Sequence, residues 1–475
     1  MFENTQQFLD MLPIIIIGAG ILISTTIEMY SEKSEAVLPW FSVFIFSAAA
    51  FYSLVYADKQ SIILQNMLST GGITNIFYFI FNIGAAIVCL LSLDYTKKYG
   101  MNYGEYYILI QASVLGMMFM AGAKDLFMIF LGLEIMSVSF YVLAGVNRKK
   151  EKAIEGALKY FLLGAFATGF LVYGIALIYG SAQSTSIEVI TAGFTSLTGN
   201  ILFVAGVLLF LIGFSFKIAA FPFHMWVPDV YQGSPTTVSG LFSTAGKAAA
   251  FSAIIATLAA LFNSSPDNIF SPYLSVLALF SMLFGSIVAI AQSNIKRMLA
   301  YSSISHAGYM LIGLAAGSFD GTAGVIFYLT VYTFMNLAAF GIVALIEGEN
   351  ETNLELDSYS GLGNRNPVLA ALLSICMFSL AGIPPMAGFF GKYYVFIAAI
   401  KSDLIWLAIV GIFSSVISVY FYLRVVVLMY FKDSEFEKVP AKSFSGFLGV
   451  TISILLIIAL GIFPGSLLDL ITSYL

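Results

Sequence analysis

Apolar segments of membrane-spanning length follow one another along almost the whole chain. A helix needs about 20 apolar residues to cross the hydrocarbon core of a bilayer. Fourteen segments approach or exceed this length: 11–29, 37–57, 74–94, 106–121, 124–145, 153–180, 199–220, 234–262, 271–291, 296–317, 321–346, 367–400, 403–431 and 444–470. Only 10% of the residues are charged, against about 25% in soluble domains. The sequence therefore predicts an all-α, polytopic membrane protein that forms a single membrane domain over residues 1–475.

Lysine and arginine are concentrated in alternate connections between these segments. The connections after odd-numbered segments hold thirteen of them: Lys33, Lys97, Lys98, Arg148, Lys149, Lys150, Lys152, Lys296, Arg297, Arg365, Lys432, Lys438 and Lys442. The connections after even-numbered segments hold three: Lys59, Lys124 and Lys401. Because basic connections stay in the cytoplasm, we expect odd-numbered segments to run inward and both termini to lie outside.

Several classes of function lack the residues that they need. Cys89 and Cys376 lie in separate apolar segments and form no CxxC pair, which argues against a disulfide, a zinc site or an iron–sulfur cluster. We find no glycine-rich nucleotide loop. A net charge of -5 without a basic patch argues against nucleic acid as a partner. The acidic start MFENTQQFLDMLP does not read as a signal peptide. We therefore expect no cofactor and no metal in this chain.

Titratable side chains within the apolar segments need a specific reason, because a charge at membrane depth costs roughly 2.5–3.5 kcal/mol. Glu134 and Lys247 lie near the middle of their segments, roughly 15 Å from either surface. The alternative for Glu134 is a buried structural carboxylate paired to a neighbour, and the alternative for Lys247 is a structural role. Lys217 lies near a segment end, where snorkelling is the alternative, and His306 is either a core histidine or a proton relay. Lys392 has no acidic residue close to it in sequence.

Four further residues have simpler explanations. Glu155 and Lys159 are four residues apart, so an intrahelical ion pair accounts for them. His224 follows a proline and fits a role in the geometry of a helix break. Arg424 cannot usefully lose its proton, so we interpret it as a snorkelling or pairing cation.

Prolines and glycines interrupt two of the apolar segments. The seventh continues into KIAAFPFHMWVPD (217–229), and the twelfth contains LAGIPPMAGFFGK (380–392). The two segments are five apart and so run in opposite directions, which indicates an inverted repeat of five helices. We expect three N-terminal helices in 1–105, the repeats in 106–262 and 271–431, and a C-terminal helix in 432–475.

Interrupted helices of this kind carry ion sites near the membrane midplane. A proline frees a backbone carbonyl one turn earlier, and such polar groups are tolerated at this depth only where protein or water covers them. The candidate catalytic groups for proton translocation are Glu134, Lys217, Lys247, His306 and Lys392. No two carboxylates lie close enough in sequence for a metal or sodium cage. Burial disfavours the charged form of a lysine and a nearby carboxylate favours it, so the set suits protons.

Four motifs resemble those of the antiporter-like membrane subunits of respiratory complex I. They are FLGLEIMSVSFYVLAG, FKIAAFPFHMWVPDVYQGSPTTVSGLFSTAGKAA, NIKRMLAYSSISHAGYM and LAGIPPMAGFFGKYYVF, and the resemblance extends over essentially the whole chain. Lys392 is similar to the lysine of N-type subunits, whereas M-type subunits carry a glutamate there. L-type subunits also carry a lysine but continue into a long lateral helix. The three N-terminal segments resemble bacterial forms.

The resemblance implies a role for each candidate residue. Glu134 would pair with Lys217, Lys247 would be the central lysine, His306 the relay and Lys392 the terminal lysine. Protons would then enter from the cytoplasm near the break at 217–229 and leave outside after Lys392. Quinone reduction in neighbouring subunits would supply the energy.

The resemblance also implies an enzyme complex, a proton-pumping NADH-quinone oxidoreductase of the bacterial plasma (inner) membrane. FMN, iron–sulfur clusters and quinone would be bound by partner subunits. The neighbours would be K- and M-type membrane subunits, the lateral helix of the L-type subunit, and lipid.

Three other functions share some of these features. Subunits of Mrp-type Na⁺/H⁺ antiporters have the same motifs, and the membrane arm of a hydrogenase complex is a second relative. A scaffold that moves no ions is the third. Several titratable groups at the midplane argue against a scaffold, which gains nothing from them.

Overall fold

The computed structural model describes residues 5–262, 269–348, 352–433 and 443–475. Within these ranges, eleven helices are long and apolar enough to cross a membrane. They are α2 (Leu12–Tyr30), α3 (Ser34–Val55), α4 (Gly72–Lys98), α5 (Gly104–Gly122), α6 (Leu126–Ala144), α7 (Glu151–Ala182), the run Thr236–Leu258, α14 (Ser271–Ile290), α16 (Phe319–Ile346), α20 (Ile405–Phe431) and α21 (Phe444–Ile462). The expected multi-pass helical architecture is confirmed.

The remaining three expected segments also form helices, which are shorter or more polar. The seventh is α10 (Ile201–Lys217), the tenth is α15 (Ile295–Ala315), and the twelfth is the pair α18 (Pro367–Ala381) and α19 (Ala387–Lys401). Lys296, expected in a connection, instead lies in the first turn of α15 and is fully buried. Lys438 and Lys442, which entered the charge pattern, lie outside the described residues.

Short elements fill the connections. The connection after α3 forms an antiparallel hairpin of β1 (Ser61–Ile63) and β2 (Leu68–Thr70), with Ser61 opposite Thr70. The other short elements are α1 (Thr5–Asp10), α8 (Ile187–Ala192), α9 (Phe194–Leu197), α11 (Val227–Gly233), the 3₁₀ turn η3 (Leu356–Tyr359), α17 (Leu362–Arg365) and α22 (Pro464–Tyr474). The last expected segment is therefore two helices, because Pro464 begins a new one after Ile462.

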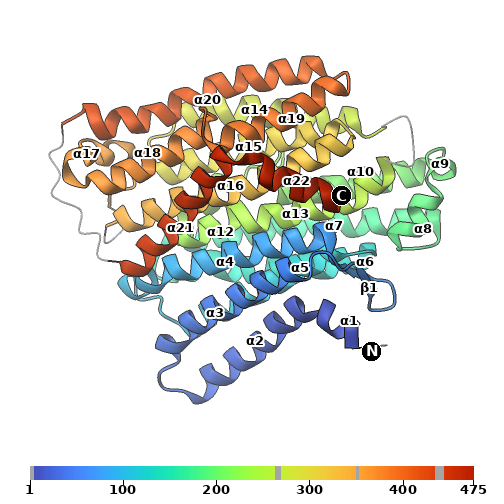
Figure 1. Ribbon diagram of the computed structural model, residues 1–475, viewed down its shortest axis with the longest axis horizontal. Helices are drawn as coiled ribbons and strands as arrows, with labels where there is room; N and C mark the ends of the chain where they lie inside the picture. Colours follow the sequence, from blue (N-terminus) through green and yellow to red (C-terminus); the bar gives the residue numbers. More distant parts are fainter. Residues whose placement is uncertain (1–4, 263–268, 349–351, 434–442) are drawn as a thin grey trace.

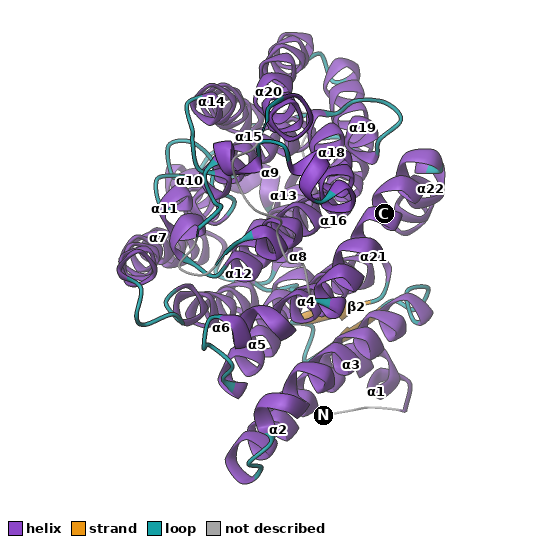
Figure 2. Ribbon diagram, turned by 90° about the vertical axis from the view of Figure 1, so that its left-hand side faces the viewer, coloured by secondary structure: helices purple, strands orange, loops and turns teal. Residues whose placement is uncertain are grey.

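The helices lie side by side, with α2 and α3 at one edge of the molecule and α20 at the other (Figure 1). Seen after a quarter turn, α16 lies in the interior of the bundle (Figure 2). It packs against α4, α12 (Thr236–Leu241), α15, α18, α19 and α21. Nearly all of its residues are buried, whereas α7 and α20 expose many apolar side chains, such as Phe166 and Val416, on the outside. Groups brought next to α16 are therefore shielded from lipid.

Both predicted helix breaks are present, and each follows directly from its sequence. Helix α10 ends at Lys217 before α11 begins, and α18 ends at Ala381 before α19 begins. The chain turns through a left-handed residue in each break: Ala219 at φ 64° and Gly382 at φ 84°. Glycine adopts this conformation readily, whereas a residue with a side chain adopts it rarely. Each break thus places a lysine beside backbone that is not helical.

A third irregularity was not predicted. The eighth segment is not a regular α-helix, because the π-helical turn η1 (Phe242–Gly246) separates α12 from α13 (Lys247–Phe262). Single π-turns in helices are rare and are often found at functional sites. Lys247 is the first residue after this turn.

Candidate functional site

Four of the predicted basic side chains are buried in the interior of the bundle. Lys217, Lys247, His306 and Lys392 are exposed by 7%, 1%, 1% and 4%, respectively. They come from α10, α13, α15 and α19. Buried charged groups in proteins must be paired or hydrogen-bonded, so the partners of each one determine what it can do.

Lys217 ends α10 and reaches towards α6. Its Nζ donates to Ser137 Oγ at 2.8 Å and to Tyr141 OH at 3.3 Å. The rings of Tyr141 and Tyr160 lie 5.4 and 5.9 Å from the same nitrogen, within the range of cation–π attraction. The lysine is thus held by neutral hydroxyl groups and aromatic faces.

Glu134 lies one helical turn before Ser137 on α6. Its Oε1 accepts a hydrogen bond from Thr168 Oγ1 of α7 at 3.0 Å. Among the ion pairs within 4 Å in the described residues, none joins Glu134 to Lys217. The expected direct pair is absent from this conformation, in which Ser137 and Tyr141 take the lysine's hydrogen bonds. A pair between Glu134 and Lys217 remains a prediction for another conformation.

Lys247 points from α13 towards α15. Its Nζ donates to both the carbonyl oxygen and the hydroxyl of Ser303, each at 2.5 Å. The ring of Tyr332 lies 5.6 Å away. The π-turn before Lys247 packs closely on α6, since a Cβ at Gly246 would lie 2.5 Å from a ring carbon of Phe140.

His306 is hydrogen-bonded at both ring nitrogens. Its Nδ1 lies 2.8 Å from Tyr328 OH on α16, and its Nε2 lies 3.0 Å from Tyr422 OH on α20. A phenol can donate or accept, so either neutral tautomer of the ring is satisfied here. An imidazole held in this way can take a proton on one nitrogen and release one from the other.

Lys392 binds the broken end of α18. Its Nζ donates to the Ala381 carbonyl at 2.8 Å and to Ser415 Oγ of α20 at 2.8 Å. The ring of Tyr309 lies 5.0 Å from the same nitrogen. Because Gly382 turns away from the helix, the Ala381 carbonyl is available to the lysine.

One face of α15 connects these groups. Ser303 binds Lys247, His306 follows three residues later, and Tyr309, three residues further on, lies against Lys392. Residues at this spacing are neighbours on one face of a helix. Lys247, Ser303, His306, Tyr309 and Lys392 therefore follow one another along α15 in the interior, and we call this set of residues the central line.

Glu155 and Lys159 belong to a separate, half-exposed cluster. Lys159 pairs with Glu155 at 2.6 Å, as predicted, and also with Asp229 of α11 at 2.7 Å. Asp229 in turn binds Arg297 of α15 at 2.8 Å. This cluster ties α7, α11 and α15 together. The sequence analysis did not single out Asp229, because this residue lies beside a proline-containing break that resembles a surface turn.

His224 lies in an aromatic environment within the first break. The side chain is 6% exposed, and its ring centre lies 4.6 Å from that of Phe284 and 5.4 Å from that of Phe221. Within the described residues its Nδ1 has no hydrogen-bond partner. These contacts agree with a role in shaping the break.

Sequence reasoning missed a buried carboxylate at the end of α16. Glu347 is 1% exposed, and its Oε2 accepts from Thr236 Oγ1 at 2.6 Å and from Tyr95 OH at 3.2 Å. It follows directly after an apolar segment, where a glutamate normally reaches water. The sequence carries no signal that the neighbouring connections cover it.

These features together define a class of protein: a multi-pass helical membrane protein with two interrupted helices and an internal line of titratable groups. A sequence profile described as NADH:quinone oxidoreductase/Mrp antiporter, TM, matches residues 123–418. The chain belongs to this family.

Comparison with individual proteins shows which members of this family the chain resembles. The chain is 43% identical over 445 residues to NADH-quinone oxidoreductase subunit N of Trichlorobacter lovleyi, covering 92% of this chain and 90% of the relative. A chain of respiratory complex I from Thermus thermophilus superposes with a TM-score of 0.83 at 29% identity, covering 97% of this chain and 99% of that one. The similarity to N-type subunits is confirmed.

A second solved structure has the same fold at lower identity. A chain of the Mrp complex from Dietzia sp. DQ12-45-1b superposes with a TM-score of 0.88 at 19% identity, over 98% of this chain and 97% of that one. Fold alone therefore does not separate the two kinds of complex, whereas sequence identity favours the quinone oxidoreductases.

Proposed function

We propose that this chain is the proton-translocating, antiporter-like N subunit of an NADH-quinone oxidoreductase. The observation that supports this best is the central line, in which every buried cation contacts a hydroxyl, a carbonyl or an aromatic ring. No fixed counter-charge lies on the line within the described residues. A lysine without a fixed counter-charge can lose and regain its proton, because burial disfavours its charged form.

The mechanism that fits these contacts moves a proton from Lys247 to Lys392. The proton leaves the Nζ of Lys247, passes through Ser303 or water to one nitrogen of His306, and leaves from the other nitrogen. It then reaches the neutral amine of Lys392 past Tyr309. Movement of Glu134 into contact with Lys217 stabilises the charge on Lys217, and separation removes that stabilisation.

The free energy of a buried ion pair is large enough to account for the movement of a charge across the membrane. Moving one charge against a membrane potential of 100 mV costs about 2.3 kcal/mol. Removing one partner of a buried ion pair costs about 3–5 kcal/mol, so the closing of one such pair is large enough to drive such a step.

The setting of the subunit follows from the same family membership. We place the chain in a bacterial inner membrane with the lysine-rich connections in the cytoplasm and both termini outside. Flavin, iron–sulfur clusters and quinone belong to partner subunits, and K- and M-type membrane subunits and the L-type lateral helix are its neighbours. The two segments 106–262 and 271–431 are the inverted repeats, each with one broken helix.

Substitution in the assembled complex tests the assignment. Glu134→Gln and Lys247→Ala should each lower the number of protons pumped per electron in reconstituted vesicles. Lys401→Ala is a matched control, because Lys401 pairs with Asp320 on the surface with 64% of its side chain exposed. If Lys247→Ala pumps as the wild type does, the central line does not carry protons, and normal pumping by Glu134→Gln removes the proposed role of its pair with Lys217.

A sodium antiporter of the Mrp type is the alternative that the shared fold supports. The N-subunit assignment predicts that the chain co-purifies with flavin and iron–sulfur subunits and that pumping does not need sodium. Co-purification with small membrane proteins alone, together with sodium-dependent transport, would favour the antiporter.

A further inference from the structure

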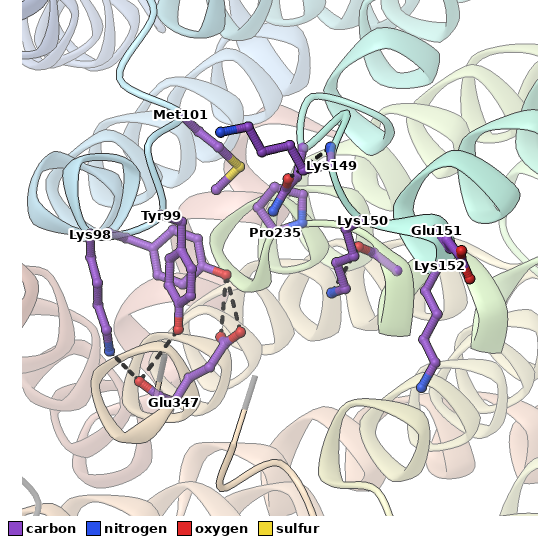
Figure 3. A pocket seen from close by; sticks show the side chains of 12 residues that line it. Lys98, Tyr99, Met101, Lys149, Lys150, Glu151, Lys152, Pro235 and Glu347 are labelled. Carbon is purple, nitrogen blue, oxygen red and sulfur yellow. Dashed lines mark hydrogen bonds between the residues drawn. The ribbon is translucent and has the colours of Figure 1, made fainter. Parts of the chain in front are cut away.

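The described part of the chain contains a pocket on the side that we place in the cytoplasm. It has a volume of about 600 Å³ and is lined by Tyr95, Lys98, Tyr99, Lys149, Lys150 and Glu347, among others. Figure 3 shows Glu347 beside Lys98 and Tyr99, with Lys150 and Lys152 on the other side of the pocket. The pocket has room for many water molecules, so protons in the cytoplasm can reach Glu347.

Neutral donors hold the Glu347 carboxylate in place. Thr236 Oγ1 donates to Oε2 at 2.6 Å, and Tyr95 OH lies 3.2 and 3.4 Å from the two carboxylate oxygens. The backbone carbonyl of Glu347 accepts from Lys98 Nζ and, at 3.5 Å, from Tyr99 OH. The main chain is thus anchored by the lysine, while the carboxylate faces hydroxyl groups that tolerate either protonation state.

A helical segment connects the inner side of Glu347 with Lys247. Thr236 is the first residue of α12, which continues through η1 to Lys247 eleven residues later, a rise of roughly 16 Å. On the facing helix, Lys296 lies seven residues before Ser303 and is fully buried. Because a spacing of seven returns to the same face of a helix, Lys296 extends the central line towards Glu347.

Buried polar groups lie beside this route at Lys296 and Ser234. Lys296 Nζ donates to the Ser234 carbonyl at 2.6 Å. The hydroxyl of Ser234, which is 1% exposed, has no hydrogen-bond partner within the described residues. Buried polar atoms are normally satisfied by protein or by ordered water. This hydroxyl is therefore available to hydrogen-bond a water molecule, two residues from the Thr236 that binds Glu347.

We propose that Glu347 is the group that takes up protons from the cytoplasmic pocket and passes them to Lys247. A hydronium ion in the pocket transfers its proton to a carboxylate oxygen and becomes water. The resulting carboxylic acid releases the proton to water beside Thr236 and Ser234 and becomes a carboxylate again. The proton then forms an N–H bond with the neutral amine of Lys247. This inference rests on the proposed function and adds its uptake residue.

The test compares three variants in the intact complex, reconstituted into vesicles. Glu347→Gln keeps an amide oxygen for Thr236 and Tyr95 but removes the titratable group. We expect it to lower the protons pumped per electron by the same amount as Lys247→Ala. Glu151→Gln is the matched control, since Glu151 lines the same pocket but is exposed, and it should pump as the wild type does.

The outcomes separate the inference from the proposed function. Normal pumping by the Glu347→Gln complex beside reduced pumping by Lys247→Ala overturns the uptake role alone. Normal pumping by Lys247→Ala overturns both. Should Glu347→Gln fail to assemble, Thr236→Val replaces it, because this change removes the hydroxyl on the inner side of the carboxylate and keeps the acid. Reduced pumping by Thr236→Val supports the proposal, and a normal ratio contradicts it.

Discussion

At the scale of single residues, the titratable groups of the central line have neutral hydrogen-bond partners. Ser303, Tyr328 and Tyr422 supply hydroxyls to Lys247 and to His306. The sequence predicted the cations, because a charge inside an apolar segment is unusual. It could not predict the hydroxyl partners, because serine and tyrosine are common in membrane helices and their spacing does not say which helix they face. Glu347 was also missed, because the residues that bury it are far from it in sequence although they are close in space.

Lys150 offers a prediction at this scale. It precedes the first turn of α7 and lies outside the membrane-spanning helices. Burial, together with the nearby Lys296 and Lys152 ammonium groups, lowers the pKa of Lys150 to about 7, and Glu347 opposes the shift. Because an amine reacts only when neutral, acetylation of Lys150 in the native complex should rise with pH around a midpoint near 7. An ordinary lysine has its midpoint at about pH 10.4.

Mass spectrometry after brief acetylation at a series of pH values measures this midpoint. The same lysine in the chain denatured in dodecyl sulfate is the control, and its midpoint should return to the ordinary range. A midpoint of about 10.4 in the native complex would contradict the burial of Lys150 beside the Lys296 and Lys152 ammonium groups.

At the scale of elements, the two broken helices and the π-turn place the basic groups. Proline and glycine made both breaks predictable, since these residues have direct effects on the backbone. The π-turn in FSTAG contains no proline, so the sequence alone does not distinguish it from a regular turn of α-helix. The ion pairs of Asp229 depend on three helices far apart in sequence and were equally hidden.

Gly382→Ala tests the second break. At φ 84°, an alanine costs roughly 1–2 kcal/mol relative to glycine, and its Cβ would lie 3.0 Å from the Lys392 Cδ. We expect a lower thermal stability of the complex and reduced proton pumping, because Lys392 must move away from the Ala381 carbonyl.

Gly18→Ala is the control for that substitution, since a Cβ at Gly18 meets nothing within 4 Å. It should change neither stability nor pumping. Wild-type pumping by Gly382→Ala would mean that the position of Lys392 at the break does not matter for transport.

At the scale of the whole molecule, the sequence predicted the fold class and the number of segments well. Fourteen apolar runs, with thirteen basic residues expected in alternate connections, leave few alternative topologies. The arrangement in space was less accessible, because apolar helices in lipid select their neighbours by the fit of small residues and by hydrogen bonds. The position of α16 at the centre, with α15 bringing Lys247, His306 and Lys392 together, emerges only from that packing.

The central claim is that these three residues serve one path. Its most direct test is the number of protons pumped per electron by complexes carrying Lys247→Ala, Lys392→Ala or both changes. Because one blocked step closes a single path, the account predicts the same loss in all three. A double variant that pumps clearly less than either single variant, or a single variant that pumps normally, would contradict it.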